Sequence, residues 1–157
     1  EGYDISNISG TSAVGSMVVF VDGEPDKREY RKFRIRTVEQ SDRAHRSLGG
    51  GGDTGMLREV LLRRFAHTPP AGGWDLPALI MVDGGVGQVH TAEQVVAEVG
   101  LKIPVVGIAK GPERKRNDII GKVPKGIEEK TLIRVRDEAH RFAVAYHRKV
   151  RTRESLR

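Results

Sequence analysis

Asp83 stands at the end of an apolar run and directly before two glycines, a pattern that places an acid at the edge of a sheet. The run 79–82 (LIMV) is apolar throughout, as in a strand buried on both faces, and glycines at 84, 85 and 87 permit a tight turn. In open α/β sheets, functional sites form at the carboxyl ends of strands, which makes Asp83 a candidate for chemistry. The alternative is that Asp83 caps the helix expected over 86–99.

Asp4 is a second candidate, because it lies inside the first expected strand between Tyr3 and Ile5. A carboxylate within a strand is costly to bury unless it is paired or binds a metal ion. If the strands that carry Asp4 and Asp83 are neighbours, about 5 Å apart, the two carboxylates could share one divalent cation. Mg²⁺ or Mn²⁺ would offset the repulsion between the acids and prefers such oxygen ligands.

Composition restricts the classes of protein and partner. The 157 residues, 38% of them hydrophobic, suffice for one globular domain with a real core, and no apolar run approaches the ~20 residues of a membrane-spanning helix. The absence of cysteine excludes disulfides and thiolate metal sites and is compatible with a reducing cytoplasm. The chain does not begin with Met, which suggests a domain from a longer protein.

The charge of the chain favours a polyanionic partner such as nucleic acid. The formal net charge is +6, the isoelectric point is about 9.8, and basic residues gather in 110–125 and 148–157. Aromatic residues make up only 5% of the chain, so a platform of stacked aromatics is disfavoured and contacts to backbone phosphates are expected.

The pattern of elements predicts an α/β fold, a mixed sheet with helices packed on it. Strands are expected over 2–8, 14–21 and 30–37 as an antiparallel three-strand meander with a turn at 22–25, followed by a glycine-rich flexible loop over 38–52 and a helix over 53–65. The Asp83 strand, the helix 86–99 and a strand over 103–109 form a parallel crossover. The segment 111–126 is expected to be a hairpin or a flexible basic loop. A helix over 127–150 presents an apolar stripe at helical spacing, made of Leu132, Val135, Ala139, Phe142, Tyr146 and Val150.

This order of elements is that of ribonuclease H-like folds, and seven stretches of sequence point to one family within them. In family order, they resemble the C-terminal endonuclease domain of UvrC, the incising subunit of bacterial nucleotide excision repair. The most specific stretch is RDEAHRFAVAYHR at 136–148, and the others are YDISNISG at 3–10, SMVVFVDG at 16–23, YRKFRI at 30–35, LLRRF at 61–65, VDGGVGQ at 82–88 and VVGIAKG at 105–111.

The resemblance implies a metal-dependent DNA endonuclease whose catalytic residues are Asp4, Asp83 and His140. Asp4 and Asp83 would hold Mg²⁺ or Mn²⁺, with one ion preferred to two. His140 would act as a general base or as a ligand, and His147, about two turns further along the same helix face, is its rival. Asp53 aligns with an additional acid of some family members, although it also suits the cap of its helix.

Basic residues near this site are expected to contact DNA. Lys110, directly after the strand 103–109, could hold a phosphate as a point charge, and the nucleic-acid-binding set is completed by Arg114, Lys115, Arg116 and Arg141. The solvated surface of a basic loop is the plainer alternative.

The resemblance also implies partners and a larger assembly. These are damaged double-stranded DNA, cut on the 5′ side of the lesion, and UvrB, with UvrA acting earlier and with the UvrB contact mainly in other parts of the chain. The residues 151–157 would be a basic tail that leads to a tandem helix-hairpin-helix domain. Cytoplasmic localisation follows from the same family.

Two other functions compete with catalysis. One is a non-catalytic DNA-binding or partner-binding module that keeps the fold without its ion, and the presence of both acids with His140 argues against it. The other is a nucleotide pocket on GGVG at 84–87, which lacks the following Lys-Ser or Lys-Thr and does not match G-x-G-x-x-G.

Overall fold

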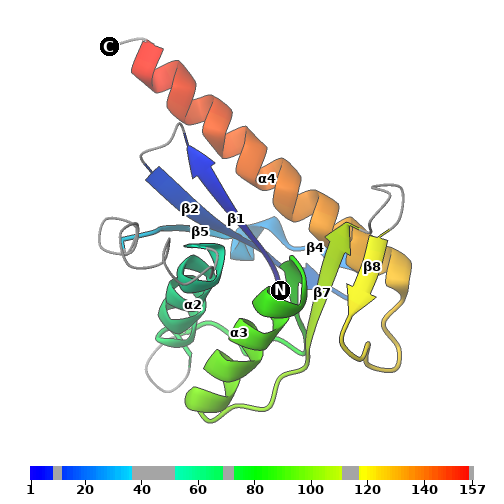
Figure 1. Cartoon of the computed structure of the whole chain (residues 1–157). Coiled ribbons are helices and arrows are strands. Elements are labelled where there is room, and N and C mark those ends of the chain that lie inside the picture. Colours follow the sequence, from blue (N-terminus) through cyan, green and yellow to red (C-terminus); the bar gives the residue numbers. More distant parts are fainter. Residues whose placement is uncertain (9–11, 37–51, 69–72, 111–116, 156–157) are drawn as a thin grey trace.

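A mixed six-stranded sheet runs through the molecule, with helices on both of its faces (Figure 1). This computed structural model describes residues 1–8, 12–36, 52–68, 73–110 and 117–155. The sheet order is β5-β2-β1-β6-β7-β8, so the strands of the Asp4 and Asp83 segments are neighbours. The strands are β1 (Gly2–Ile8), β2 (Ser12–Val18), β5 (Arg31–Arg34), β6 (Ile80–Asp83), β7 (Val105–Lys110) and β8 (Asn117–Ile120), and the helices are α2 (Gly52–Phe65), α3 (Val86–Glu98) and α4 (Glu129–Ser155).

The expected antiparallel meander is confirmed, with β2 between β1 and β5. The strand expected over 14–21 divides, because β2 ends at Val18 and a separate two-stranded hairpin follows, made of β3 (Phe20–Val21) and β4 (Glu24–Pro25). Its turn residues Asp22 and Gly23 both have positive φ, 53° and 80°, as a tight hairpin turn requires. A short 3₁₀ turn, η1 (Lys27–Glu29), then leads to β5, which is shorter than the expected 30–37.

The parallel half of the sheet is also confirmed. β1 pairs with β6 and β6 pairs with β7, both in parallel, and α3 makes the crossover between β6 and β7. The strand β8 pairs antiparallel with β7, so the segment 111–126 contains the second strand of a hairpin. The residues 111–116 and 37–51 lie outside the described part of the chain, and Gly52 begins α2 instead of ending the expected loop.

A close approach of the backbone fixes the turn that follows Asp83. A Cβ atom on Gly107 of β7 would lie 2.7 Å from the carbonyl oxygen of Gly84, so only glycine allows the turn to pass β7 there. The backbone nitrogen of Gly84 donates a hydrogen bond to the carbonyl oxygen of Ile108, 3.1 Å away. The end of β6 is therefore tied to β7 immediately after the acid.

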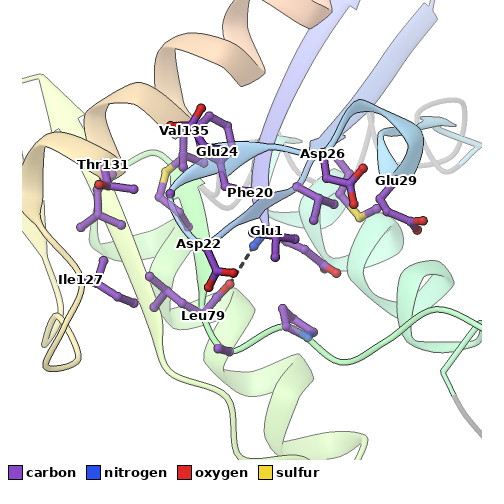
Figure 2. Close-up of a pocket in the computed structure, with 18 of the residues that line it drawn as sticks. Glu1, Phe20, Asp22, Glu24, Asp26, Glu29, Leu79, Ile127, Thr131 and Val135 are labelled. Carbon is purple, nitrogen blue, oxygen red and sulfur yellow. Dashed lines mark hydrogen bonds between the residues drawn. The ribbon is translucent and has the colours of Figure 1, made fainter.

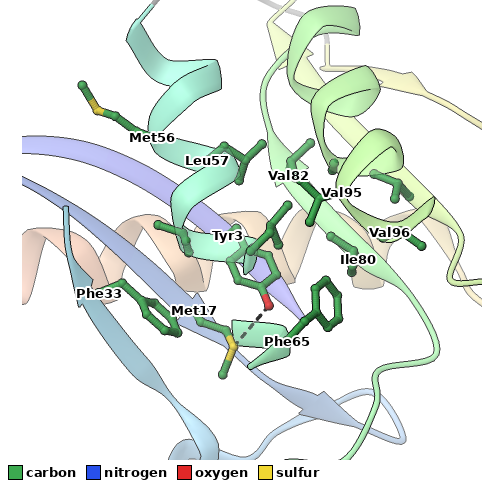
Figure 3. Packing of buried hydrophobic residues seen from close by; sticks show 14 of the residues in the cluster. Tyr3, Met17, Phe33, Met56, Leu57, Phe65, Ile80, Val82, Val95 and Val96 are labelled. Carbon is green, nitrogen blue, oxygen red and sulfur yellow. Dashed lines mark hydrogen bonds between the residues drawn. The ribbon is translucent and has the colours of Figure 1, made fainter. Parts of the chain in front are cut away.

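Alternate residues of the strands face two separate cores. The helices α2 and α3 cover one face, where Tyr3, Met17, Ile80 and Val82 pack against Leu57 and Val95 (Figure 3). The hydroxyl of Tyr3 approaches the sulfur of Met17 at 3.3 Å in this cluster. The other face is covered by α4, which packs against Val18, Met81, Val106 and Ile108. Because side chains alternate along a strand, Asp4 and Asp83 belong to the α4 face.

The helix α4 is longer than the expected 127–150 and continues to Ser155, so residues 151–155 of the expected basic tail are helical. Leu132, Val135 and Ala139 of the expected stripe are buried, and the stripe also includes Ala143, which is 3% exposed. The rest of the expected stripe, Phe142, Tyr146 and Val150, is only half-buried. Among the described helices, none has the length and apolar character needed to cross a membrane.

Candidate active site

Asp4 and Asp83 are brought side by side by the parallel pairing of β1 and β6. Gly2 is paired with Met81 and Tyr3 with Val82, so the next residues along the two strands are Asp4 and Asp83. Neighbouring strands lie ~4.8 Å apart, which is close enough for one cation to contact both carboxylates. The expected pairing of these strands is therefore confirmed. The two acids lie side by side at the carboxyl end of β6.

His140 reaches the same place from α4. Its Nδ1 atom lies 3.7 Å from Oδ2 of Asp4. The side chain of His140 is 71% exposed, whereas that of Asp4 is only 11% exposed. The residue before it, Ala139, is fully buried against the sheet, so the helix holds His140 at the rim beside the buried stripe.

Asp83 does not cap α3. The N-cap residue of that helix is Gly85, which makes no side-chain capping bond, and Asp83 stands two residues earlier as the last residue of β6. Asp83 is exposed while the other β6 residues are buried. The acid therefore ends a buried strand with its side chain open to solvent.

The chemistry of these side chains fits a small divalent cation. Asp4 is a nearly buried carboxylate, which is costly in the absence of a positive charge. Within the described ranges, no group of three or more His, Asp or Glu side chains converges to form a complete metal cage. Mg²⁺ is commonly bound by one or two carboxylates, with water and substrate phosphate as its other ligands, so the Asp4 and Asp83 pair suits it.

His147 occupies a different environment from His140. Its Nε2 atom lies 2.8 Å from the hydroxyl oxygen of Ser6, which is two residues beyond Asp4 on β1. Burial lowers the pKa of His147, and the positive charges of Arg151 and Lys32 lower this pKa further. The histidine at Asp4 is therefore His140, and His147 pairs with the next residue on the same face of β1.

The residues expected to contact DNA are only partly described. Lys110 is the last residue of β7, two positions beyond Ile108, which is paired with Asp83. Arg114, Lys115 and Arg116 lie outside the described residues. Asp53 is the second residue of α2. That helix begins at Gly52, one residue earlier than expected.

Arg141 is engaged in an ion pair on the surface of α4. Its guanidinium donates hydrogen bonds of 2.9 Å and 2.5 Å to the carboxylate of Glu138, which also accepts a 3.2 Å hydrogen bond from the hydroxyl of Tyr30. These bonds, with that from Arg141 the strongest, lower the pKa of Glu138. The Arg141 side chain is still 55% exposed, so a role on DNA would compete with this ion pair.

A cavity of about 930 Å³ lies at the opposite end of the sheet (Figure 2). Its lining includes Leu79 and Met81 at the start of β6, the first turns of α4, and several acidic side chains, namely Glu1, Asp22, Glu24, Asp26, Glu29, Asp75 and Glu128. Neither Asp4 nor His140 lines it. The abundance of carboxylates disfavours DNA phosphates there, and the cavity is separate from the candidate active site.

Sequence reasoning missed the row of residues that flanks Asp4. Asp4 is paired with Ser16 on β2, and Ser16 is paired with Lys32 on β5, so the three residues lie in line on the α4 face. Ser16 is fully buried, and its hydroxyl has no hydrogen-bond partner among the described residues. The alternation of β1 was readable in the sequence, but the partners across the sheet were not.

The molecule is thus an α/β domain with a mixed sheet, in which two adjacent carboxylates and a histidine of α4 meet where β6 ends. The chain belongs to the UvrC endonuclease family, because residues 1–144 match the family model described as the UvrC RNAse H endonuclease domain. The ribonuclease H-like fold and the endonuclease class expected from the resemblance are thereby confirmed.

Individual relatives agree with the family match. The chain is 44% identical over 165 residues to the UvrABC system protein C of Streptococcus pyogenes serotypes M6 and M5, and the alignments cover 99% of this chain. The chain spans about a quarter of the length of these relatives, 26%. Among solved structures, the crystal structure of human ENDOV superposes with a TM-score of 0.44 at 19% identity, covering 82% of this chain and 48% of that one.

Proposed function

We propose that this domain hydrolyses a DNA phosphodiester bond with one divalent cation held by Asp4 and Asp83. The observation that carries the proposal is that three groups lie together at the carboxyl end of β6. These are the two carboxylates on adjacent strands and His140, whose Nδ1 atom is 3.7 Å from Asp4. When bound, Mg²⁺ or Mn²⁺ polarises a non-bridging phosphate oxygen and stabilises the charge that develops on it.

His140 is assigned the role of general base. Its imidazole is mostly exposed, so water can reach it, and it takes the proton from the attacking water molecule. The nearby carboxylate of Asp4 stabilises the imidazolium that forms.

The wider role proposed for the domain is nucleotide excision repair in the cytoplasm. The relatives named UvrABC system protein C support this role, and so does the net charge of +6. In this role Lys110, Arg114, Lys115, Arg116 and Arg141 contact the DNA backbone. In this role the substrate is damaged double-stranded DNA, cut on the 5′ side of the lesion, and the partners are UvrB and, earlier in the pathway, UvrA.

The test is incision of a duplex with a single lesion by the full-length protein, with its damage-recognition partners and Mg²⁺. Asp4→Asn and Asp83→Asn should abolish the 5′ cut while the cut on the other side and DNA binding persist. Asp75→Asn is the matched control, because Asp75 is an exposed acid at the cavity on the opposite end of the sheet. Survival of the 5′ cut in Asp83→Asn would contradict the proposal and favour a non-catalytic binding module.

A further inference from the structure

The contact between β1 and α4 continues past the candidate active site as a second polar pair. Asp4 faces His140, and two residues further on the same face of β1 Ser6 bonds His147 at 2.8 Å. Two strand residues span ~6.8 Å and seven helix residues span ~10.5 Å, so the second pair lies next to the first. This line of contact between β1 and α4, here called the seam, extends past the end of β6 at Asp83, because only the first residues of β1 pair with β6.

Positive charge gathers at this second pair. Arg151 follows His147 by one helical turn, and its charge is close enough to lower the pKa of His147. Lys32 acts on His147 in the same direction, and the pKa of Lys32 is itself lowered to about 8, mainly by burial and further by the charge of Lys149. Among the described residues, none of these three cations is held in a salt bridge, in contrast to Arg141, which is paired with Glu138.

The residues that α4 contributes to this seam lie on one side of the helix. At ~100° per residue, His140, His147 and Arg151 lie within about 40° of one another around the helix. Arg153 points about 160° away from Arg151, although both are exposed arginines in the last turns of the helix. The stripe therefore leads from the candidate catalytic histidine to Arg151, for which no salt bridge is found among the side chains that the structure describes.

We propose that Ser6, His147 and Arg151 form a binding site for a backbone phosphate of the cut DNA strand, within a few nucleotides of the scissile phosphate. With the Nε2–H of His147 donated to Oγ of Ser6, the hydroxyl of Ser6 can donate to a phosphate oxygen. Arg151 supplies the charge and a planar fork suited to phosphate oxygens. A bound phosphate offsets the repulsion among the cations that gather near His147, namely Arg151, Lys32 and Lys149. This site rests on the proposed function, because it assumes that the seam follows a DNA strand.

The test measures binding of uncut duplex DNA by the full-length protein across a range of salt concentrations. All variants carry Asp83→Asn, so that binding is read without cleavage. Arg151→Gln should reduce the slope of log affinity against log salt by about one unit. With ~0.9 counterion released per phosphate contact, the advantage of the parent protein over Arg151→Gln should shrink about 3.5-fold between 0.05 M and 0.2 M salt.

The matched control is Arg153→Gln, which removes the same charge from another side of the helix and should alter the slope much less. Ser6→Ala and His147→Gln should weaken DNA binding at every salt concentration without lowering the thermal midpoint enough to unfold the protein. An unchanged slope in Arg151→Gln, or an equal change in Arg153→Gln, would overturn the phosphate site.

The phosphate site and the proposed function fail in different ways. If Asp83→Asn leaves incision intact, the catalytic assignment fails, while the salt slope of Arg151→Gln still decides the phosphate site. If Asp83→Asn abolishes incision but Arg151→Gln leaves the salt slope unchanged, the catalytic assignment is retained and the phosphate site is rejected. The hydrogen bond between Ser6 and His147 then serves only to hold α4 against β1.

Discussion

The imidazole of His140 and the carboxylate of Asp4 lie 3.7 Å apart although they belong to the two ends of the chain. One side chain is mostly exposed and the other nearly buried, so the pair spans the boundary between the core and the solvent. A buried carboxylate can hold a cation or stabilise an imidazolium, and an exposed imidazole can exchange protons with water. Their contact joins β1 to the middle of α4.

Replacement of the two α4 histidines should separate chemistry from binding. His140→Ala should reduce the turnover of incision by about 10²–10⁴-fold, the usual contribution of general acid–base catalysis, with little change in DNA affinity. His147→Gln should instead reduce affinity, because His147 lies at Ser6 and not at Asp4. Single-turnover incision at saturating and limiting protein checks this, and equal losses of turnover in both variants would contradict the assignment.

The position of α4 should depend on the glycine at the start of β1. A Cβ atom on Gly2 would clash with Cγ1 of Val135, so Gly2→Ala should push α4 away from β1. Overpacking of this kind costs about 1–3 kcal/mol, and the displaced helix should also slow incision by moving His140.

The double variant with Gly2→Ala and Val135→Ala is the control for this effect. Removal of the valine methyl groups makes room for the new Cβ, so part of the lost stability and incision should return. Urea unfolding of both variants and of Val135→Ala alone gives the coupling between the sites. Strictly additive losses would show that the contact between Gly2 and Val135 does not set the position of the helix.

Arg64 should be a major determinant of stability far from the candidate site. Its side chain is 0% exposed, donates a 2.7 Å hydrogen bond to the carboxylate of Glu1, and bonds the carbonyl oxygen of Asp75 at 2.5 Å. Arg64→Ala should cost about 3–5 kcal/mol in the free energy of unfolding, since it leaves the Glu1 carboxylate buried without the guanidinium that balances its charge. Arg64→Lys keeps the positive charge, so its free energy of unfolding should fall less than that of Arg64→Ala. Chemical denaturation measures both values, and equal losses of stability would show that packing and not charge is responsible.

Mild acid should destabilise the protein through His147. Burial, Arg151 and Lys32 lower the pKa of His147 in the folded state, so in the window just below pH 6.5 the unfolded chain binds more protons than the native one. Stability therefore falls as the pH decreases through this window. Among the residues that the structure describes, Ser6, Tyr146, Arg151 and Lys32 are found against His147, and none of these four is acidic.

His147→Gln removes this titration, so its free energy of unfolding should change less than that of the parent protein between pH 7 and pH 5. Arg151→Gln should raise the pKa of His147 and give an intermediate pH dependence. Parallel pH profiles for the parent protein and His147→Gln would contradict the lowered pKa.

Local patterns in the sequence were enough to predict most elements. The apolar run before Asp83, the glycines after it and the stripe of α4 predicted a strand, a turn and a helix, because side-chain alternation and helical periodicity are properties of short segments. The division at Val18 was not predicted, since 14–21 is apolar almost throughout and only the fold shows where pairing with β1 ends.

Asp4 and Asp83 could be selected from the sequence as a pair of acids for one cation, whereas the role of His140 came from family resemblance. The sequence by itself determined which side chains can bind a cation or move a proton, and on which kind of element each one lies. Only the tertiary structure placed β6 beside β1, set His140 and not His147 against Asp4, and aligned Ser6 with His147. These relationships depend on strand order, on register and on the crossing of α4 over the sheet, which are fixed by packing between segments far apart in the chain and not by any local pattern.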